Sequence, residues 1–233
     1  MKNRELIPCP SDARLADHAA QEWLDQLPAS SAGLYLVGLS GGRIAKQFFA
    51  AIAQRARASD FSKVHFFWAD ERCVPPEHPD SNFLLAQKNL FEPLQISEDQ
   101  IHRIHGEEAP QVAAHKATSE LMARASLSSN GWPILDMVFL GMGEDGHVAS
   151  LFPHGADEAS GAVYYPVIAS KPPPNRITIG YGVLAEARSV WVLASGAGKE
   201  EALRTSLDGT ASTPLRKVLD SRGMTRIFTD VEL

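Results

Sequence analysis

The chain has 233 residues, of which 44% are hydrophobic and 21% charged, and its formal net charge is -6. This composition is typical of a packed globular protein, and the acidic balance excludes a nucleic-acid partner because binding a phosphate backbone requires a basic surface. Two distant cysteines, Cys9 and Cys73, exclude a disulfide framework and fit no metal-site spacing. An anionic small substrate fits this charge where a few cations gather locally.

The predicted elements alternate between helices and buried strands along the whole chain. Apolar residues at helical spacing follow Ser11 or Asp12, either of which could cap the first helix. Short continuous apolar runs predict strands at 34–39, 64–69, 135–140, 176–182, 190–194 and 225–228. Further helices are predicted after residue 42 as far as 56, near 82–91, over 110–126 and after Lys199.

This alternation predicts an α/β fold that is doubly wound, with a mainly parallel sheet and helices on both faces. The sequence contains no internal repeat, and strands continue beyond the proline-rich segment 171–176, so we expect a single domain over residues 1–233. The N-terminal segment lacks the apolar core of a signal peptide, and no run is long enough to span a membrane. We therefore expect a cytoplasmic protein with no membrane partner.

Four polar or glycine-rich segments directly follow predicted strands: 40–42, 70–72, 141–147 and 195–199. In an open parallel sheet the strands end at one edge, and ligands bind in the crevice there. We therefore expect these four segments to form one cleft.

Two of these segments have the composition of anion-binding loops. Ser40-Gly41-Gly42 opens a helix, where backbone N–H groups and the helix dipole favour an anion, although a simple tight turn would look the same. Arg43 opposes the dipole unless it serves a bound anion or points into water. The segment ending in Lys199 lacks the spacing of a P-loop and has Glu200 in place of the magnesium-binding hydroxyl. It therefore suits a phosphate without metal, or carries a solvated lysine.

The segment 141–147 contains the strongest catalytic candidate. Its G-x-G-x-x-G pattern does not indicate a dinucleotide site, because no clear helix follows and Asp145 would face the pyrophosphate. Asp145-Gly146-His147 instead presents a carboxylate beside an imidazole, and a histidine, with its reference pKa of about 6.5, can take a proton from water near neutral pH. A structural histidine that caps the next turn is the alternative.

The remaining polar groups have weaker patterns. Residues 70–72 place Asp70, Glu71 and Arg72 at a strand end, where they form either part of a site or a surface ion pair, and we expect one carboxylate to be structural. His102 and His105 have H-x-x-H spacing without an acidic or thiol partner pattern, so we expect loop residues and no metal site.

Five motifs, in order, resemble those of the 6-phosphogluconolactonase family: LSGG at 39–42, DERCVPPEHPDSN at 70–82, GMGEDGHVASLFP at 141–153, KPPPNRIT at 171–178 and SGAGK at 195–199. The resemblance implies hydrolysis of 6-phosphoglucono-1,5-lactone to 6-phosphogluconate, the second step of the oxidative pentose phosphate pathway, without metal or cofactor. This small phosphorylated lactone would be the protein's partner, and we expect a monomer.

The resemblance also implies a role for each matching residue. His147 would activate water, with Asp145 and Asp70 as supporting carboxylates. Arg72 and Arg176 would serve the phosphate or the developing oxyanion, and an antiparallel strand starting at Arg176 would bring it to the active edge. The phosphate would be held by Ser40, Gly41, Gly42 and Lys199, with Arg43 as a further candidate.

Two other functions remain open. Glucosamine-6-phosphate deaminases share the loop, but they resemble each other in having a carboxylate five residues beyond the histidine, where this chain has Phe152. An apolar side chain cannot transfer a proton, which disfavours isomerisation. A non-catalytic sugar-phosphate sensor would keep Lys199 and the glycine turn but would need neither His147 nor Asp145, and no output module is visible.

Overall fold

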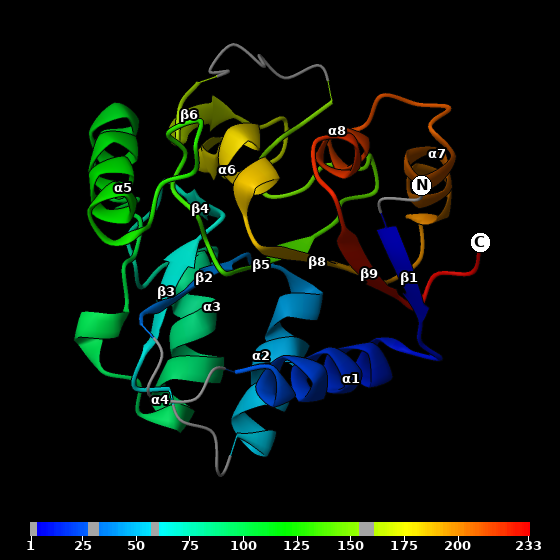
Figure 1. Ribbon diagram of the computed structural model, residues 1–233, viewed down its shortest axis with the longest axis horizontal. Coiled ribbons are helices and arrows are strands. Elements are labelled where there is room, and N and C mark those ends of the chain that lie inside the picture. The colour runs from blue at the N-terminus through cyan, green and yellow to red at the C-terminus, as the bar shows by residue number, and fades with distance from the viewer. Residues whose placement is uncertain (1–3, 28–32, 57–60, 154–160) are drawn as a thin grey trace.

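The computed structural model describes residues 4–27, 33–56, 61–153 and 161–233. Its centre is a six-stranded sheet in the order β1-β9-β8-β5-β2-β3, and every pair of neighbours is parallel (Figure 1). The strands are β1 (Arg4–Pro8), β2 (Tyr35–Leu39), β3 (Val64–Trp68), β5 (Met137–Gly141), β8 (Ser189–Ala194) and β9 (Thr225–Thr229).

A smaller antiparallel sheet stands at the end of β3. It contains β4 (Asp70–Arg72), β7 (Asn175–Ile179) and β6 (Tyr164–Ile168), in the order β4-β7-β6. Ala69 alone separates β3 from β4, so the chain passes directly from one sheet into the other. The second sheet thereby adds its polar residues to the carboxyl edge of the first.

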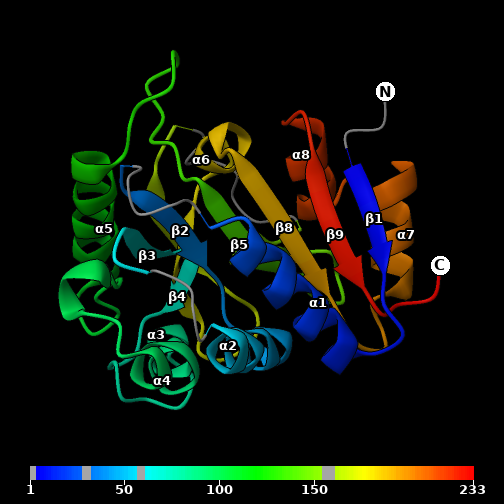
Figure 2. The ribbon, with the colours of Figure 1, turned by 60° about the horizontal axis from the view of Figure 1, so that its bottom comes forward.

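Helices cover both faces of the large sheet. Figure 2 shows α1 (Asp12–Asp25) and α2 (Arg43–Arg55) in front, with α6 (Tyr181–Glu186), α7 (Glu200–Asp208) and α8 (Pro214–Asp220) behind. The helix α5 (Pro110–Arg124) packs instead on the smaller sheet, against β6 and β7. Short helical turns complete the fold: α3 (Asn82–Ala86), a π-helical turn η1 (Gln87–Phe91), α4 (Glu92–Leu94) and a 3₁₀ turn η2 (Glu98–Gln100).

Aromatic side chains fill the space between the front helices and the sheet. The Trp23 and Phe139 rings meet edge to face at 5.3 Å between centroids, and Phe48 lies 4.6 Å from Phe139. Trp191 continues the cluster to Phe228 at 4.9 Å. All five side chains are at most 2% exposed. Rings in such contacts add about 0.5–1.5 kcal/mol per pair beyond their buried area, which stabilises the packing of α1 and α2 on the sheet.

The predicted doubly wound, mainly parallel sheet is confirmed, and the side chain of Ser11 caps α1 as expected. The predicted strand 176–182 is too long, because β7 ends at Ile179 and Tyr181 already begins α6. The segments β1, β6, α6 and α8 were not predicted, and 70–72 is a strand of its own rather than a strand end. Across the described ranges, every helix is too short or too polar to cross a membrane.

Candidate functional site

The strand order reverses between β2 and β5, since β3 lies on one side of β2 and β5 on the other. Pairing between β2 and β5 involves Val37 with Met137 and Gly38 with Val138, and it stops before the carboxyl ends of the strands. A cavity of about 350 Å³ opens at this edge. Such a topological switch point is where open α/β sheets bind ligands.

The structure brings the predicted residues together in this cavity. Nine of the ten line it, and the tenth, Asp145, contacts one of the nine through a hydrogen bond to His147. Lys199 and His147 come from loops after different strands and line the same cavity. The prediction that the four segments form one cleft is therefore confirmed. The nine are Ser40, Gly41, Gly42, Arg43, Asp70, Arg72, His147, Arg176 and Lys199.

The turn after β2 depends on its two glycines. Gly42 has φ of 103°, which favours glycine, and a Cβ on Gly41 would overlap the amide of Asn82. Ser40 is 7% exposed, and its hydroxyl has no hydrogen-bond partner among the described residues. A buried hydroxyl without a partner is costly in the free protein, so it is a donor available to a ligand.

One end of the cavity is strongly cationic. The Arg43 guanidinium lies against Gly196, where an added Cβ would overlap it. Burial and the neighbouring charge of Arg43 lower the pKa of Lys199. Asp230 fixes the loop between β8 and α7, since it accepts hydrogen bonds from the Ser195 hydroxyl and the Gly196 N–H, both at 3.0 Å. Two close cations at helix starts suit an anion of more than one charge.

The imidazole of His147 is oriented by its neighbours on the loop. Its Nδ1 lies 2.5 Å from Oδ1 of Asp145, which also accepts from the His147 backbone N–H at 3.1 Å. A carboxylate can only accept, so the neutral ring carries its proton on Nδ1 and leaves the Nε2 lone pair free. A Cβ on Gly143 would overlap the ring, and Gly146 has φ of 78°.

The protonation state of Asp145 supports this orientation. Burial raises the pKa of the carboxyl, but the backbone N–H, charge and ring of His147 outweigh it, and the net pKa is lowered. Asp145 therefore stays ionised near neutral pH.

The two acidic residues of β4 differ in their surroundings. Glu71 accepts from the backbone N–H groups of Arg72, Asn82 and Phe83 and from the Ser81 hydroxyl, and burial raises its pKa to about 7. It anchors the start of α3 and does not line the cavity, so it is the structural carboxylate expected from the sequence. Asp70 is 4% exposed and faces the cavity.

The arginines come from paired strands. Arg72 and Arg176 are register partners in the antiparallel β4–β7 pair, which confirms that an antiparallel strand brings Arg176 to this edge. Burial and the charge of Arg72 lower the pKa of Arg176, whose guanidinium lies 5.6 Å from the Phe152 ring centroid. The Nε of Arg72 is buried without a partner among the described residues, while Nη1 donates to the Asp80 carbonyl at 2.7 Å.

Comparison with known proteins identifies the family of this chain. The family described as glucosamine-6-phosphate isomerases/6-phosphogluconolactonase matches residues 10–227. The chain belongs to this family. It is 36% identical to the 6-phosphogluconolactonase of Treponema pallidum over 185 residues, which cover 77% of this chain and 75% of the relative. It is 35% identical to that of Aggregatibacter actinomycetemcomitans over 203 residues, 83% and 84% of the two chains.

Solved structures agree with this assignment. The structure of the 6-phosphogluconolactonase from Trypanosoma brucei superposes with a TM-score of 0.85 at 25% identity, covering 98% of this chain and 96% of that one. The resemblance read from the five motifs is therefore confirmed at the level of family and fold.

Three polar residues in or beside the cavity were not predicted from the sequence. Asn82 and Glu144 line the cavity, and the Ser150 hydroxyl is bonded to Asp70. Phe152, which the sequence did single out, touches the His147 ring with 5.0 Å between centroids. The three missed residues lie inside the quoted motifs 70–82 and 141–153. Membership of a motif was therefore the available signal, but spacing alone did not indicate what these side chains contact.

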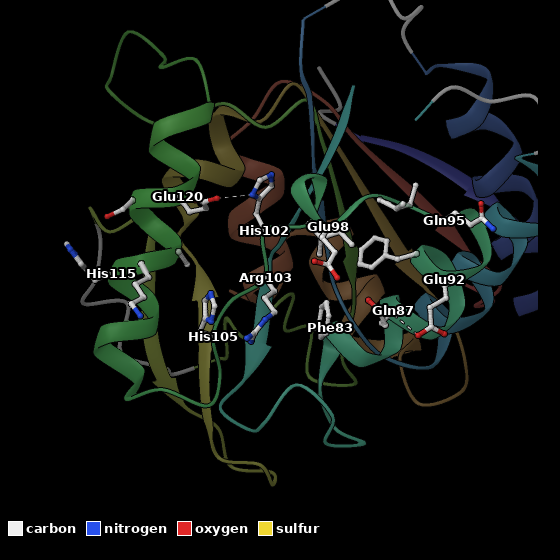
Figure 3. Close-up of a pocket in the computed structure, with 16 residues that line it drawn as sticks. Phe83, Gln87, Glu92, Gln95, Glu98, His102, Arg103, His105, His115 and Glu120 are labelled. Carbon is white, nitrogen blue, oxygen red and sulfur yellow. Dashed lines mark hydrogen bonds and ion pairs between the residues drawn. The ribbon is translucent and has the colours of Figure 1, made fainter. Parts of the chain in front are cut away.

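A larger cavity lies elsewhere. A groove of about 970 Å³ runs between α5 and the α3–α4 segment, and Figure 3 shows His102 pointing to Glu120 across it. The Nδ1 of His102 lies 2.9 Å from Glu120, and its Nε2 lies 2.8 Å from His65. His105 lies in the same groove, away from the candidate site. Within the described ranges, no three His, Cys, Asp or Glu side chains are grouped to hold a metal ion.

Proposed function

We propose that this protein hydrolyses 6-phosphoglucono-1,5-lactone to 6-phosphogluconate, with His147 as the general base. The observation that carries the proposal is the shared cavity: an imidazole oriented by Asp145 lines the same 350 Å³ space as Arg43 and Lys199. The relatives named 6-phosphogluconolactonase support the reaction. The cavity supports the distribution of roles, with cations for a phosphate at one end and a base at the other.

In the proposed mechanism, Lys199, Arg43 and the Ser40 turn bind the phosphate and fix the lactone ring. Nε2 of His147 takes a proton from water, and the water oxygen attacks the lactone carbonyl. A general base in this role contributes about 10²–10⁴ in rate. The carbonyl carbon becomes tetrahedral, and its oxygen gains negative charge close to the guanidinium groups of Arg72 and Arg176.

Collapse of this intermediate breaks the bond between the carbonyl carbon and the ring oxygen. The imidazolium of His147 returns its proton to that oxygen, and the new carboxylic acid ionises in water. A δ-lactone is already reactive, so the step needs no covalent nucleophile. The positive charges of Arg72 and Arg176 stabilise the developing oxyanion, which is a role that a metal ion has in other hydrolases. We propose that the reaction proceeds without a metal.

Phe152 favours lactone hydrolysis over the deaminase reaction of the same family. The deaminase pattern has a carboxylate at this position to help open the sugar ring. Here an aromatic ring stands between the His147 imidazole and the Arg176 guanidinium, at 5.0 and 5.6 Å. It can shield the base from bulk water, but it cannot transfer a proton.

A lactonase assay tests the proposal. Freshly prepared 6-phosphogluconolactone is given to the wild type, to His147→Ala and to His115→Ala, and the spontaneous rate is subtracted. His115 is an exposed histidine of the α5 groove and serves as the matched control. We expect His147→Ala to lose about 10²–10⁴ in kcat and His115→Ala to match the wild type. Full activity in His147→Ala would remove this residue from the mechanism, and ammonia release from glucosamine 6-phosphate would favour the deaminase.

A further inference from the structure

Ser150 lies on the same loop as His147, but its side chain reaches a different element. Its hydroxyl donates to Oδ2 of Asp70 on β4 at 2.7 Å, and the residue is completely buried. The bond joins residues 80 positions apart in the sequence. A hydroxyl bonded to an ionised carboxylate is a charge-assisted donor, stronger than a neutral pair.

The backbone of the loop is shaped to make this contact. Ala149 has φ of 50°, a left-handed conformation that is uncommon for a residue with a Cβ, and it lines the cavity. The N–H of Ser150 then donates to the Thr178 hydroxyl on β7 at 3.2 Å. Strained backbone persists where the surrounding structure requires it, often at functional sites. Here it turns Ala149 toward the cavity and Ser150 into the protein.

Asp70 is held from a second side by Asn82. The Asn82 amide donates to the Asp70 carbonyl at 2.9 Å and approaches its Oδ1 at 3.4 Å. Because Oδ2 accepts from Ser150 and the Asn82 amide holds the backbone carbonyl, the Asp70 carboxylate can present the remaining lone pairs of Oδ1 to the cavity that it lines. Its orientation therefore depends on a donor that comes from the histidine loop.

We infer that Ser150 is a positioning residue that fixes Asp70 relative to His147. It joins the loop after β5 to β4, so the two groups keep one relative geometry while both face the substrate. The inference rests on the proposed function, in which Asp70 supports the base. It assigns Ser150 no contact with substrate.

The test compares Ser150→Ala and Ser150→Cys with the wild type. Cysteine keeps the volume but is a weak donor, so it separates the lost bond from lost packing. We expect both variants to lose about ten- to a hundredfold in kcat, the range for one hydrogen bond to a charged group. We expect KM to change less than threefold, because Arg43 and Lys199 are untouched. In an Asp70→Asn background the same substitutions should have almost no further effect, since residues that act through one another are not additive.

Ser81→Ala is the matched control. Its hydroxyl donates at 3.2 Å to Glu71, the neighbouring buried carboxylate that does not line the cavity. A purely structural role would lower the melting temperature in all three serine variants and leave kcat of the folded enzyme unchanged, and that result would overturn the inference. Additive effects of the Ser150 and Asp70 substitutions would also overturn it.

Crystal structures of the Ser150 variants provide a readout that does not depend on activity. We expect the Asp70 carboxylate or the 145–150 loop to move from its wild-type place. Unchanged positions of Asp70 and His147 would refute the positioning role. A wild type that hydrolyses no lactone, with Asp70 displaced in the variants, would instead refute the proposed reaction and leave the structural role of Ser150 supported.

Discussion

Asp145→Asn tests how the imidazole is prepared for catalysis. In the wild type, the carboxylate accepts from Nδ1 of His147 at 2.5 Å and fixes the tautomer with a free Nε2. An asparagine amide can donate to Nδ1 instead, which would move the ring proton to Nε2. The lone pair that should take a proton from water is then turned away from the cavity.

The expected magnitude follows from these two losses. A hydrogen bond to a charged group contributes roughly 1.5–3 kcal/mol, or about 10–150-fold in rate if it is fully expressed in the transition state. The wrong tautomer removes part of the base catalysis, which contributes about 10²–10⁴. We therefore expect kcat to fall by about 10²–10³, with KM nearly unchanged because the cationic end of the cavity is intact.

Initial rates on fresh lactone measure this effect, with Glu22→Gln as the control. Glu22 lies 3.1 Å from His18 on α1, a histidine–carboxylate pair outside the cavity. The lowered pKa of Asp145 also predicts the pH dependence of kcat. The Asp145 carboxyl binds its proton only below its ordinary pKa of 3.8, so its protonation should not reduce the wild-type kcat at any pH above about 4. A fall of less than threefold in Asp145→Asn, or an equal fall in Glu22→Gln, would refute the orienting role.

Two further changes test other parts of the structure. Gly143→Ala should displace the His147 ring and lower kcat by about 10²-fold. Gly223→Ala should keep full activity, because a Cβ added there meets no atom within 4 Å, and equal rates in the two variants would contradict the packing argument. Glu107→Gln should cost about 0.5–1 kcal/mol in urea unfolding at pH 7. The Arg103 hydrogen bonds lower the pKa of Glu107 to about 2, so this stabilisation is present above about pH 4.5 and is lost as the pH falls toward 2. If the difference in the free energy of unfolding between wild type and variant stayed constant down to pH 3, the predicted loss of this stabilisation would be wrong.

The sequence predicted those parts of the fold where burial dominates. The strands β2, β3, β5, β8 and β9 are mostly buried, and their continuous apolar runs placed them within two residues. The missed strands are at sheet edges, where exposed residues interrupt the pattern. Pro166 in β6 is an example, since proline is tolerated at an edge but signals a break when read alone.

The order of strands and loops along the chain was enough to predict the cavity, but not the side-chain contacts within it. Loops at strand ends must meet at one edge, so the cavity followed from topology. The Ser150–Asp70 and Asn82–Asp70 bonds did not follow, because they connect side chains whose approach depends on the turn from β3 into β4. That turn places Asp70 opposite Thr178 in the second sheet, and no local spacing encodes this pairing.

The electrostatics of the cavity explains why a protein of net charge -6 can bind a phosphorylated substrate. Four cations line the cavity, Arg43, Arg72, Arg176 and Lys199, against the carboxylates of Asp70 and Glu144. Burial and mutual repulsion lower the pKa of both Lys199 and Arg176 in the free protein. An anion of two charges would relieve this repulsion, which supports the proposed binding of the substrate phosphate beside Arg43 and Lys199. In the proposed reaction the lactone carbonyl then lies on the His147 side of the same cavity.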